Sequence, residues 1–299
     1  MGVLSLFYKV FDKKRIYTYK TRIPQTRKIF CILRVRNEEL IIEDTLNHLA
    51  KFSDAIICYD DASTDRTFDL LSKHPKVICI IKNFKWKQKP EERIKCETSD
   101  RLQLLKLAKQ FNPEWIFCAD ADERYMGNIR EFVCSESSKE VSLVRISLFD
   151  AYLTPNDHAP YKKGQPLLNL RKYFGPERRD IIMLWRANEE GITFLGDDSR
   201  EPIYPKSSKV KTLFKCQHYG KALSIQHWEE TCNYYIKHFP YIPYGEKWEK
   251  RKGKAIHTIS DFGTPLYQWG KELFSNAVII HGGFSENEGE EKDENIAYS

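Results

Sequence analysis

Four short apolar runs, separated by segments with helical periodicity, constrain the fold of this chain more than any other feature. They occupy residues 29–33, 55–59, 77–81 and 115–119. Runs of this length are typical of strands buried on both faces of a parallel sheet. Between the first two runs, Ile42, Leu46 and Leu49 recur on one face of a helix. This alternation predicts an α/β fold with right-handed crossovers and a mostly parallel central sheet flanked by helices.

Acidic residues follow two of these predicted strands. Asp60 and Asp61 come directly after the run at 55–59, and Asp120 and Asp122 follow the run at 115–119. Ligand crevices of open α/β sheets lie outside the carboxyl ends of the strands, so we expect both clusters on one rim. Two carboxylates one residue apart suit Mg²⁺ or Mn²⁺, which can in turn hold a diphosphate. A lone Asp-x-Asp also occurs in solvated loops that cap helices, so its meaning depends on the surrounding order.

The net charge favours an anionic ligand. The 299 residues carry a formal charge of +6, but residues 285–299 hold six acids and one Lys, so that tail is −5 and the remainder +11. A basic body attracts a nucleotide, a nucleic acid or an anionic membrane surface, and peripheral membrane contact stays open. The tail has the composition of a disordered, solvated segment.

Cysteine usage indicates a reducing compartment. Of the eight cysteines, Cys31, Cys58, Cys79 and Cys118 fall inside predicted core strands, where a free thiol behaves as a small hydrophobe. No CxxC or Cys/His zinc spacing occurs. We therefore expect a cytoplasmic protein. We expect no transmembrane segment, since no uninterrupted apolar stretch approaches the roughly 20 residues of a membrane span.

Three motifs, taken in order, resemble the family 2 glycosyltransferases, which have the Rossmann-like GT-A fold. The motifs are Arg34-Val35-Arg36-Asn37-Glu38-Glu39, then Asp60-Asp61-Ala62-Ser63-Thr64-Asp65-Arg66-Thr67, then Asp120-Ala121-Asp122-Glu123. Each follows a predicted buried strand, and the similarity covers about residues 29 to 125. Arg34 is a departure, because the family often has a proline after the first strand.

The resemblance implies a metal-dependent enzyme. It implies transfer of a sugar from a nucleotide-diphosphate donor, with a UDP-sugar favoured, to a hydroxyl of a glycan or other acceptor, with inversion at the sugar carbon. The implied cofactor is Mn²⁺ or Mg²⁺, whose role is to neutralise charge on the departing diphosphate. A nucleic acid is not among the implied partners.

The resemblance also assigns donor-binding residues. Asp61 corresponds to the carboxylate that accepts a hydrogen bond from the uracil N–H, and Arg34 and Arg36 occupy the turn that contacts the base. Arg101 corresponds to a basic residue that approaches the ribose or phosphates from a helix N-terminus, because we expect a helix to begin near Ser99.

Metal ligands follow from the same resemblance. Asp122 corresponds to the direct metal ligand, and Asp120 is placed to bind the ribose or a metal-bound water. His218 is the candidate downstream ligand, and His281 is a weaker alternative. A single histidine is also compatible with a plain core position.

A catalytic base for inversion must lie near the acceptor hydroxyl. In the family it lies some 70 to 100 positions beyond the metal-binding Asp, a window that holds Asp197, Asp198 and Glu201. We favour Asp198. An acidic surface loop is the competing interpretation of this segment.

Two other functions remain in view. A nucleotidyltransferase can share this sheet and its paired acids, but it is expected to carry a Gly-rich loop after the first strand, where this chain has Arg-Val-Arg-Asn-Glu. A basic nucleic-acid-binding or scaffold protein would suit the +11 body and the lysines between Lys82 and Lys89, but no recognised nucleic-acid motif occurs.

Beyond Asp122 the pattern is less regular. It predicts strands at 141–148 and 181–185 and a helix at 223–239. The whole chain is then expected to comprise a peripheral N-terminal arm at 1–28, a GT-A catalytic domain at 29–220 with a nucleotide-sugar-binding half at 29–125 and an acceptor half at 126–220, a C-terminal helical extension at 221–284, and the acidic tail at 285–299.

Overall fold

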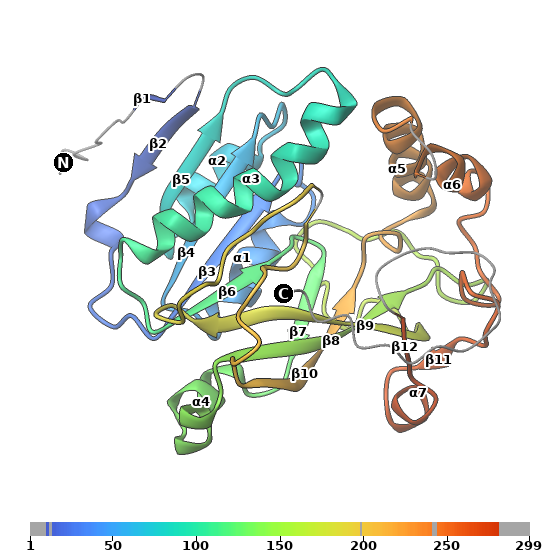
Figure 1. The fold of residues 1–299 in the computed structure, drawn as a ribbon. Coiled ribbons are helices and arrows are strands. Elements are labelled where there is room, and N and C mark those ends of the chain that lie inside the picture. Colours follow the sequence, from blue (N-terminus) through green and yellow to red (C-terminus); the bar gives the residue numbers. More distant parts are fainter. Residues whose placement is uncertain (1–9, 12–13, 198, 241–243, 281–299) are drawn as a thin grey trace.

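The computed structural model describes residues 10–11, 14–197, 199–240 and 244–280. Its strands form one 12-stranded sheet in the order β1-β2-β5-β4-β3-β6-β9-β8-β10-β7, with β11 and β12 pairing with β9 (Figure 1). The strands are β1 (Val10–Phe11), β2 (Lys14–Thr18), β3 (Ile29–Val35), β4 (Ala55–Asp61), β5 (Val77–Asn83), β6 (Trp115–Ala119), β7 (Glu123–Met126), β8 (Leu143–Ala151), β9 (Tyr173–Arg186), β10 (Val210–His218), β11 (Tyr267–Gln268) and β12 (Val278–Ile279). The helices are α1 (Ile42–Ala50), α2 (Thr67–Lys73), α3 (Pro90–Lys109), α4 (Ile129–Cys134), α5 (Ile225–His238), α6 (Tyr244–Arg251) and α7 (Lys271–Ser275), with 3-10 turns at Lys20–Arg22 and Glu136–Glu140.

The four predicted strands form the parallel centre of the sheet. β3 pairs in parallel with β4 and β6, and β4 with β5. Their side chains alternate between two buried clusters, so that Cys31 and Leu33 belong to one cluster and Phe30 and Ile32 to the other. Successive side chains of a strand point to opposite faces of the sheet, so an uninterrupted apolar run supplies buried side chains to both faces.

The expectation of a mostly parallel sheet is wrong, because the sheet is mixed. β9 runs antiparallel to both β6 and β8, and β7 runs antiparallel to β10. At the other edge, β2 pairs antiparallel with β5. Each of these antiparallel pairs includes a strand outside the parallel centre of β3 to β6, and antiparallel neighbours need no crossover helix. Outside that centre, β8 and β10 pair in parallel.

Helices cover both faces of the parallel centre, as Figure 1 shows for α3 on one face and α1 and α2 on the other. Ile42, Leu46 and Leu49 of α1 belong to the larger cluster, while Leu104 and Leu105 of α3 belong to the second. The two layers explain why both sides of each central strand are apolar.

Helix α3 begins earlier than predicted. It begins at Pro90 rather than near Ser99, with Pro90 in the first turn followed by Glu91 and Glu92. Proline at the first position and acids in the first turn both favour a helix N-terminus there. Arg101 therefore lies in the second half of α3, and the expectation that it sits at a helix N-terminus is wrong.

The C-terminal segment adds strands as well as helices. Helices α5 and α6 pack on each other through Trp228, Cys232 and Trp248, which form a small buried cluster of their own with Leu153 and Ala255. β11 and β12 then pair with β9. All eight cysteines are free, and six of them are buried.

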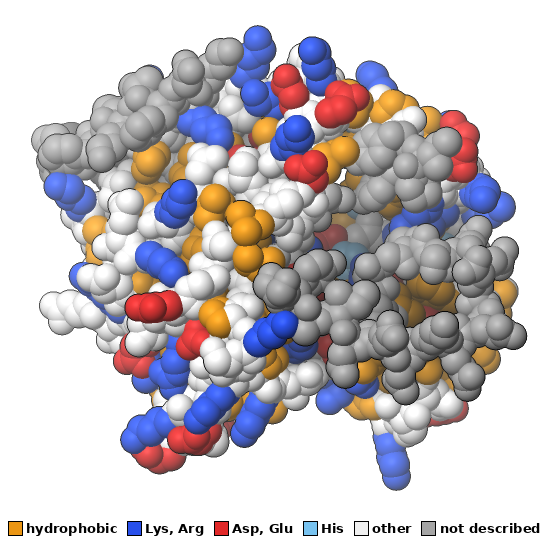
Figure 2. Space-filling model, in the orientation of Figure 1, with side chains coloured by type: hydrophobic (Ala, Val, Ile, Leu, Met, Phe, Trp, Pro, Cys, Tyr) orange, Lys and Arg blue, Asp and Glu red, His pale blue; other side chains and the backbone are white. Residues whose placement is uncertain are grey.

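Charges of both signs are intermixed over the face shown in Figure 2. Lys and Arg side chains are distributed among Asp and Glu side chains on this face and do not merge into one basic surface. Every helix in the described part of the chain is too short or too polar to cross a membrane.

We expect His48 to make the fold sensitive to acid. His48 in α1 is 6% exposed, and its Nε2 accepts a hydrogen bond from the Tyr125 backbone N–H at 2.8 Å. Burial, together with Arg124 and Lys51, lowers the pKa of His48 from 6.5 to about 4. As pH falls below the unfolded value, only the unfolded chain binds this proton, so stability is lost between about pH 6.5 and about pH 4. Denaturant unfolding measures this effect. Between about pH 7 and about pH 4.5, the free energy of unfolding of the wild type should fall by roughly 2 kcal/mol more than that of His48→Gln. Equal losses in the two proteins would contradict this.

Candidate functional site

Asp61 is locked at the carboxyl end of β4 by its two neighbouring strands. Arg34 of β3 donates from Nη2 to Asp61 Oδ2 at 2.7 Å, and Asn83 of β5 donates from Nδ2 to Asp61 Oδ1 at 2.8 Å. Asp61 is only 4% exposed. Each carboxylate oxygen keeps further acceptor capacity, because an ionised carboxylate has about four lone-pair sites.

Arg36 shapes the turn beside Asp61. Its Nη1 donates to the carbonyl oxygens of Asp61 at 2.5 Å and Ala62 at 2.7 Å. Ala62 has a φ of 54°, the left-handed region that non-glycine residues adopt at a cost. The guanidinium of Arg36 lies 4.1 Å from the ring centroid of Trp86, so a cation–π contact fixes its orientation.

Asp60 and Asp65 make turn and cap contacts. Asp60 Oδ2 pairs with Lys82 at 2.7 Å, and its Oδ1 accepts from the Ser63 backbone N–H. Asp65 accepts from the backbone N–H groups of Thr67 and Glu39. Their side chains therefore support the loop rather than the crevice.

A line of alternating charges joins Asp61 to Asp120 across the rim. Arg34 pairs with Glu97 at 2.5 Å, Glu97 pairs with Arg101 at 2.6 Å, and Arg101 pairs with Asp120 at 2.9 Å. Burial raises the pKa of Glu97, but Arg34 and Arg101 outweigh it and hold that pKa at about 2. The structure thus brings four predicted donor-site residues, Arg34, Asp61, Arg101 and Asp120, into one connected network.

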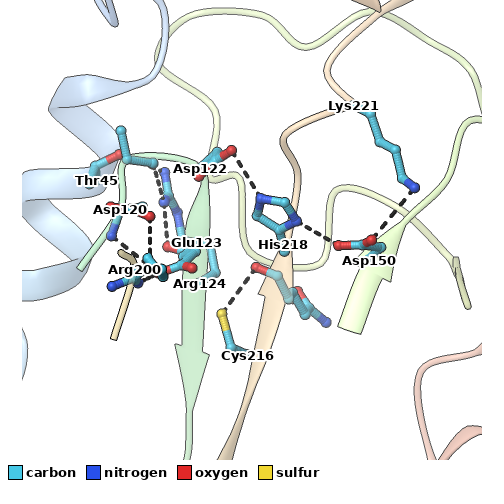
Figure 3. A network of polar contacts seen from close by, with 12 residues as sticks. Thr45, Asp120, Asp122, Glu123, Arg124, Asp150, Arg200, Cys216, His218 and Lys221 are labelled. Atoms are coloured by element: carbon cyan, nitrogen blue, oxygen red, sulfur yellow. Dashed lines mark hydrogen bonds and ion pairs between the residues drawn. The ribbon is translucent and has the colours of Figure 1, made fainter. Parts of the chain in front are cut away.

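Arg200 completes this network, and the sequence reasoning missed it. Its Nε donates to Asp120 Oδ2 at 2.8 Å and its Nη2 to Glu123 at 2.9 Å (Figure 3). Glu123 is 2% exposed, and burial raises its pKa while Arg200 opposes that effect. Arg200 lies in the same loop as the candidate bases, but no pattern in the neighbouring sequence indicated that it pairs with Asp120 and Glu123.

Asp122 and His218 lie in contact on neighbouring strands. Asp122 directly precedes β7 and His218 ends β10, which pair antiparallel with His218 opposite Glu123. His218 Nε2 lies 3.2 Å from Asp122 Oδ2, and His218 Nδ1 donates to Asp150 Oδ1 at 2.6 Å (Figure 3). Asp150, near the end of β8, was not singled out from the sequence.

The electrostatics of this pair are those of a carboxylate beside an imidazolium. Burial raises the pKa of Asp122, but His218 outweighs it and lowers that pKa to about 2. Burial lowers the pKa of His218, but Asp122 and Asp150 raise it to about 10. Each group therefore holds the other in its charged form.

Negative charge also gathers at Glu38, which the family motif contains but to which no role was assigned. Burial raises its pKa well above the usual value, and Asp122, Asp65 and Asp120 add to the increase. Burial is the largest cause of the raised pKa, and the three carboxylates lie close enough to Glu38 to add to it.

Gly220 allows the backbone to approach Asp122 and His218. A Cβ built on Gly220 would lie 2.7 Å from Asp122 Oδ2 and 2.9 Å from His218 Nε2. The backbone N–H of Tyr219 donates to the Asp122 carbonyl oxygen at 2.9 Å. The segment 218–220 therefore wraps around Asp122.

The three candidate bases have different surroundings. Asp197 is exposed, and Asp198 lies outside the described residues, as does His281, the weaker candidate metal ligand. Glu201 Oε2 accepts from both Arg145 Nη1 and the Ile182 backbone N–H, each at 2.9 Å. The carboxylate of Glu201 is thus used to hold its own loop against β9.

The residues around Asp122 fit a divalent cation. Asp122 Oδ2 lies 3.2 Å from His218 Nε2, and this nitrogen becomes a second donor when a cation displaces the proton that it carries in the ion pair. The hydrogen bond from His218 Nδ1 to Asp150 is the outer contact that commonly orients a ligating imidazole. Within the described residues no three His, Cys, Asp or Glu side chains converge to enclose a metal ion. Such an open site suits a cation whose remaining ligands are water and phosphate oxygens.

Comparisons with known proteins give partial matches. No family model matches the chain. Uncharacterised proteins from Mycobacterium bovis and Mycobacterium tuberculosis are each 32% identical over 95 residues, which is 32% of this chain and 23% of theirs. The chain thus matches less than a quarter of the length of these relatives.

Among solved structures, glucosyl-3-phosphoglycerate synthase from Mycobacterium tuberculosis is similar over 42% of this chain and 44% of its own. One such structure contains Mn²⁺, UDP and glucosyl-3-phosphoglycerate, and another contains Mn²⁺, UDP-glucose and phosphoglyceric acid. Both are 18% identical with a TM-score of 0.28. A TM-score this low does not establish a shared fold.

Removing Arg200 should destabilise the protein. Arg200→Met leaves Glu123 buried beside Asp120 without its cation, and breaking a buried pair in this way costs on the order of 3 kcal/mol. Denaturant unfolding near neutral pH measures the loss, and Arg200→Lys should recover part of it. Arg66→Met, which removes an exposed guanidinium, is the matched control. A loss no larger than that of the control would show that the Arg200 pairs contribute little.

Proposed function

We propose that this protein is a metal-dependent glycosyltransferase that moves a sugar from a nucleotide-diphosphate donor, preferably a UDP-sugar, to an acceptor hydroxyl with inversion. One observation carries the proposal. Asp122 contacts His218, which Asp150 orients, and Asp120, two residues before Asp122, is joined through Arg101 and Glu97 to the pair of Arg34 and Asp61. A cation site and a polar nucleoside site side by side match the requirements of a nucleotide-sugar donor.

Asp122 and His218 would hold the divalent cation, either Mn²⁺ or Mg²⁺. When bound, such a cation supplies electrostatic neutralisation of the diphosphate leaving group. Asp150 keeps the imidazole of His218 in place, because it accepts from Nδ1 and leaves Nε2 directed to Asp122. Asp120 is less suited to direct ligation, since Arg101 and Arg200 engage its two oxygens, and we assign it to the ribose or to a metal-bound water.

Asp61, Arg34 and Arg36 would bind the base of the donor. Asp61 would accept the uracil N–H through its remaining lone pairs, and the ion pair with Arg34 fixes the position of its carboxylate. Arg36 fixes the loop carbonyls beside it and presents a planar cation to the base. Arg101, packed between Glu97 and Asp120, holds the ribose- and phosphate-binding side of the crevice in register.

Proton removal from the acceptor hydroxyl would fall to the loop that Arg200 anchors. Asp198 remains the preferred base and Asp197 the alternative. Glu201 is the least suited, because one of its oxygens already accepts two hydrogen bonds. We place this activity in the cytoplasm, which eight free cysteines support.

Calorimetric titration with UDP, with and without Mn²⁺, tests the cation site. The wild type should bind UDP more tightly with Mn²⁺. Asp122→Asn and His218→Ala should each weaken the Mn²⁺-dependent binding at least about tenfold, because each removes a ligand. Asp69→Asn on the exposed side of α2 is the control. Absence of UDP binding to the wild type, together with no release of nucleoside diphosphate from a panel of nucleotide-sugars, would refute the function.

Gly220→Ala should impair the same site without unfolding the protein. The new methyl group would lie within 3 Å of Asp122 Oδ2 and His218 Nε2, so these two side chains must move apart. We expect Mn²⁺-dependent UDP binding to fall roughly tenfold, with little change in denaturant unfolding. Gly164→Ala provides a control for backbone strain alone, since its φ is 92° and a Cβ there meets no atom within 4 Å. Unchanged UDP binding in Gly220→Ala would show that the close approach is not needed.

A further inference from the structure

A line of ion pairs leads from His218 away from Asp122 into the C-terminal segment. Asp150 pairs with His218 and also with Lys221, at 3.5 Å (Figure 3). Lys221 is 7% exposed and also pairs with Asp261, which in turn pairs with Arg251 at 2.5 Å. The proposed cation site and the segment after α6 are therefore connected by direct contacts.

Asp261 and Arg251 line a cavity of about 410 Å³ at the end of this line. Lys250 and Lys254 line the same cavity, as do Trp228 and His257. Asp261 is the single carboxylate among the described residues of its lining, and both Lys221 and Arg251 already engage it. The lining therefore carries more cations than anions.

The walls of the cavity are held in place before any ligand arrives. Trp228 is 1% exposed, and its Nε1 donates to the Arg251 carbonyl oxygen at 3.0 Å. The ring of His257 packs against the rings of Trp228 and Tyr152 at centroid distances of 5.1 and 5.0 Å. The backbone N–H of Gly253 donates to Glu229 at 2.9 Å, which ties the loop to α5. A cavity with fixed walls loses little entropy on binding.

The surroundings of the cavity are electropositive. Burial, together with Arg251 and Lys221, lowers the pKa of the neighbouring Lys247 to about 7. Burial raises the pKa of Asp261, but His257, Lys221 and Arg251 outweigh it and leave that pKa far below its usual value. Burial alone would lower the pKa of Lys247, so it is the shift of Asp261, which the cations produce against the effect of burial, that indicates their excess.

We infer that this cavity is an acceptor subsite that binds a phosphate monoester group of the acceptor molecule. Arg251 offers a planar set of donors, and Lys250 and Lys254 supply point charges, a combination suited to a dianionic oxyanion. The line through Lys221, Asp150 and His218 joins the subsite to Asp122, the proposed ligand of the cation that would hold the donor diphosphate. The inference rests on the proposed function and adds to it the chemical class of the acceptor.

Calorimetric titration of the full chain with inorganic phosphate tests the subsite. Saturating UDP and Mg²⁺ are present so that the donor site is filled. Lys250→Ala/Lys254→Ala removes two exposed lysines of the lining, and Lys237→Ala/Lys252→Ala removes two exposed lysines outside it. We expect the first double variant to weaken phosphate binding at least about tenfold, as loss of charge-assisted contacts should, and the second to change it less than about twofold.

Titration with acetate separates a dianion site from a general anion site. We expect acetate to bind at least about tenfold more weakly than phosphate, because it carries one charge and two oxygens. Equal affinity for the two anions, equal effects of the two double variants, or no phosphate binding to the wild type would each overturn the inference.

Failure of the subsite and failure of the proposed function give different results. Binding of UDP with Mg²⁺ is measured on the same samples before phosphate is added. Normal UDP binding together with no phosphate binding would refute the phosphate subsite but not the proposed transferase function. If UDP does not bind, the phosphate titration is repeated without nucleotide, and the contrast between the two double variants then decides whether the cavity binds phosphate.

Discussion

Paired charge at the carboxyl ends of the central strands is the interaction on which the rest of this structure depends. Asp61, Asp100 and Glu123 are each less than 5% exposed, and a buried carboxylate without a partner is costly. Arginines from β3 and from the loop after β9 supply the missing charge. Breaking one pair leaves its partner buried without compensation, so each of these pairs contributes to the stability of the rim.

The same pairing divides the rim into two functional zones. In the part of the rim that we propose for the donor, every carboxylate oxygen of Asp61 and Asp120 has a guanidinium or amide partner, so these carboxylates are held in fixed positions. Around Glu38, burial raises the pKa of its carboxyl group, and the neighbouring acids Asp122, Asp65 and Asp120 raise it further. A positively charged ligand is expected where carboxylates are in excess, and a negatively charged ligand is expected where cations are in excess.

The sequence predicted the centre of the fold well, because apolar runs and helical periodicity report local burial. Strands β3 to β6 begin where the runs begin, and β3, β4 and β5 each continue two residues beyond the predicted ranges. The mixed sheet was missed, because strand direction in the second half is set by long-range pairing of β9 with β6 and β8. Asp122 and His218, which only the family resemblance singled out as a pair, lie in contact, and their role in metal binding stays a prediction. Arg200 and Asp150 were missed because their contacts join distant segments, such as Arg200 with Asp120, that no local pattern encodes.

Strand β9 has a consequence for folding. Most of β9 pairs with β8. Its carboxyl-terminal part also pairs with β6 of the first half, and its amino-terminal part pairs with β11 near residue 267. Residues 29–125 on their own would leave β6 as an open edge with unpaired backbone groups. The two halves are thus expected to melt in a single cooperative transition, and since the contacts of β9 join residues far apart in the chain, closing this strand into place should be a slow step in folding.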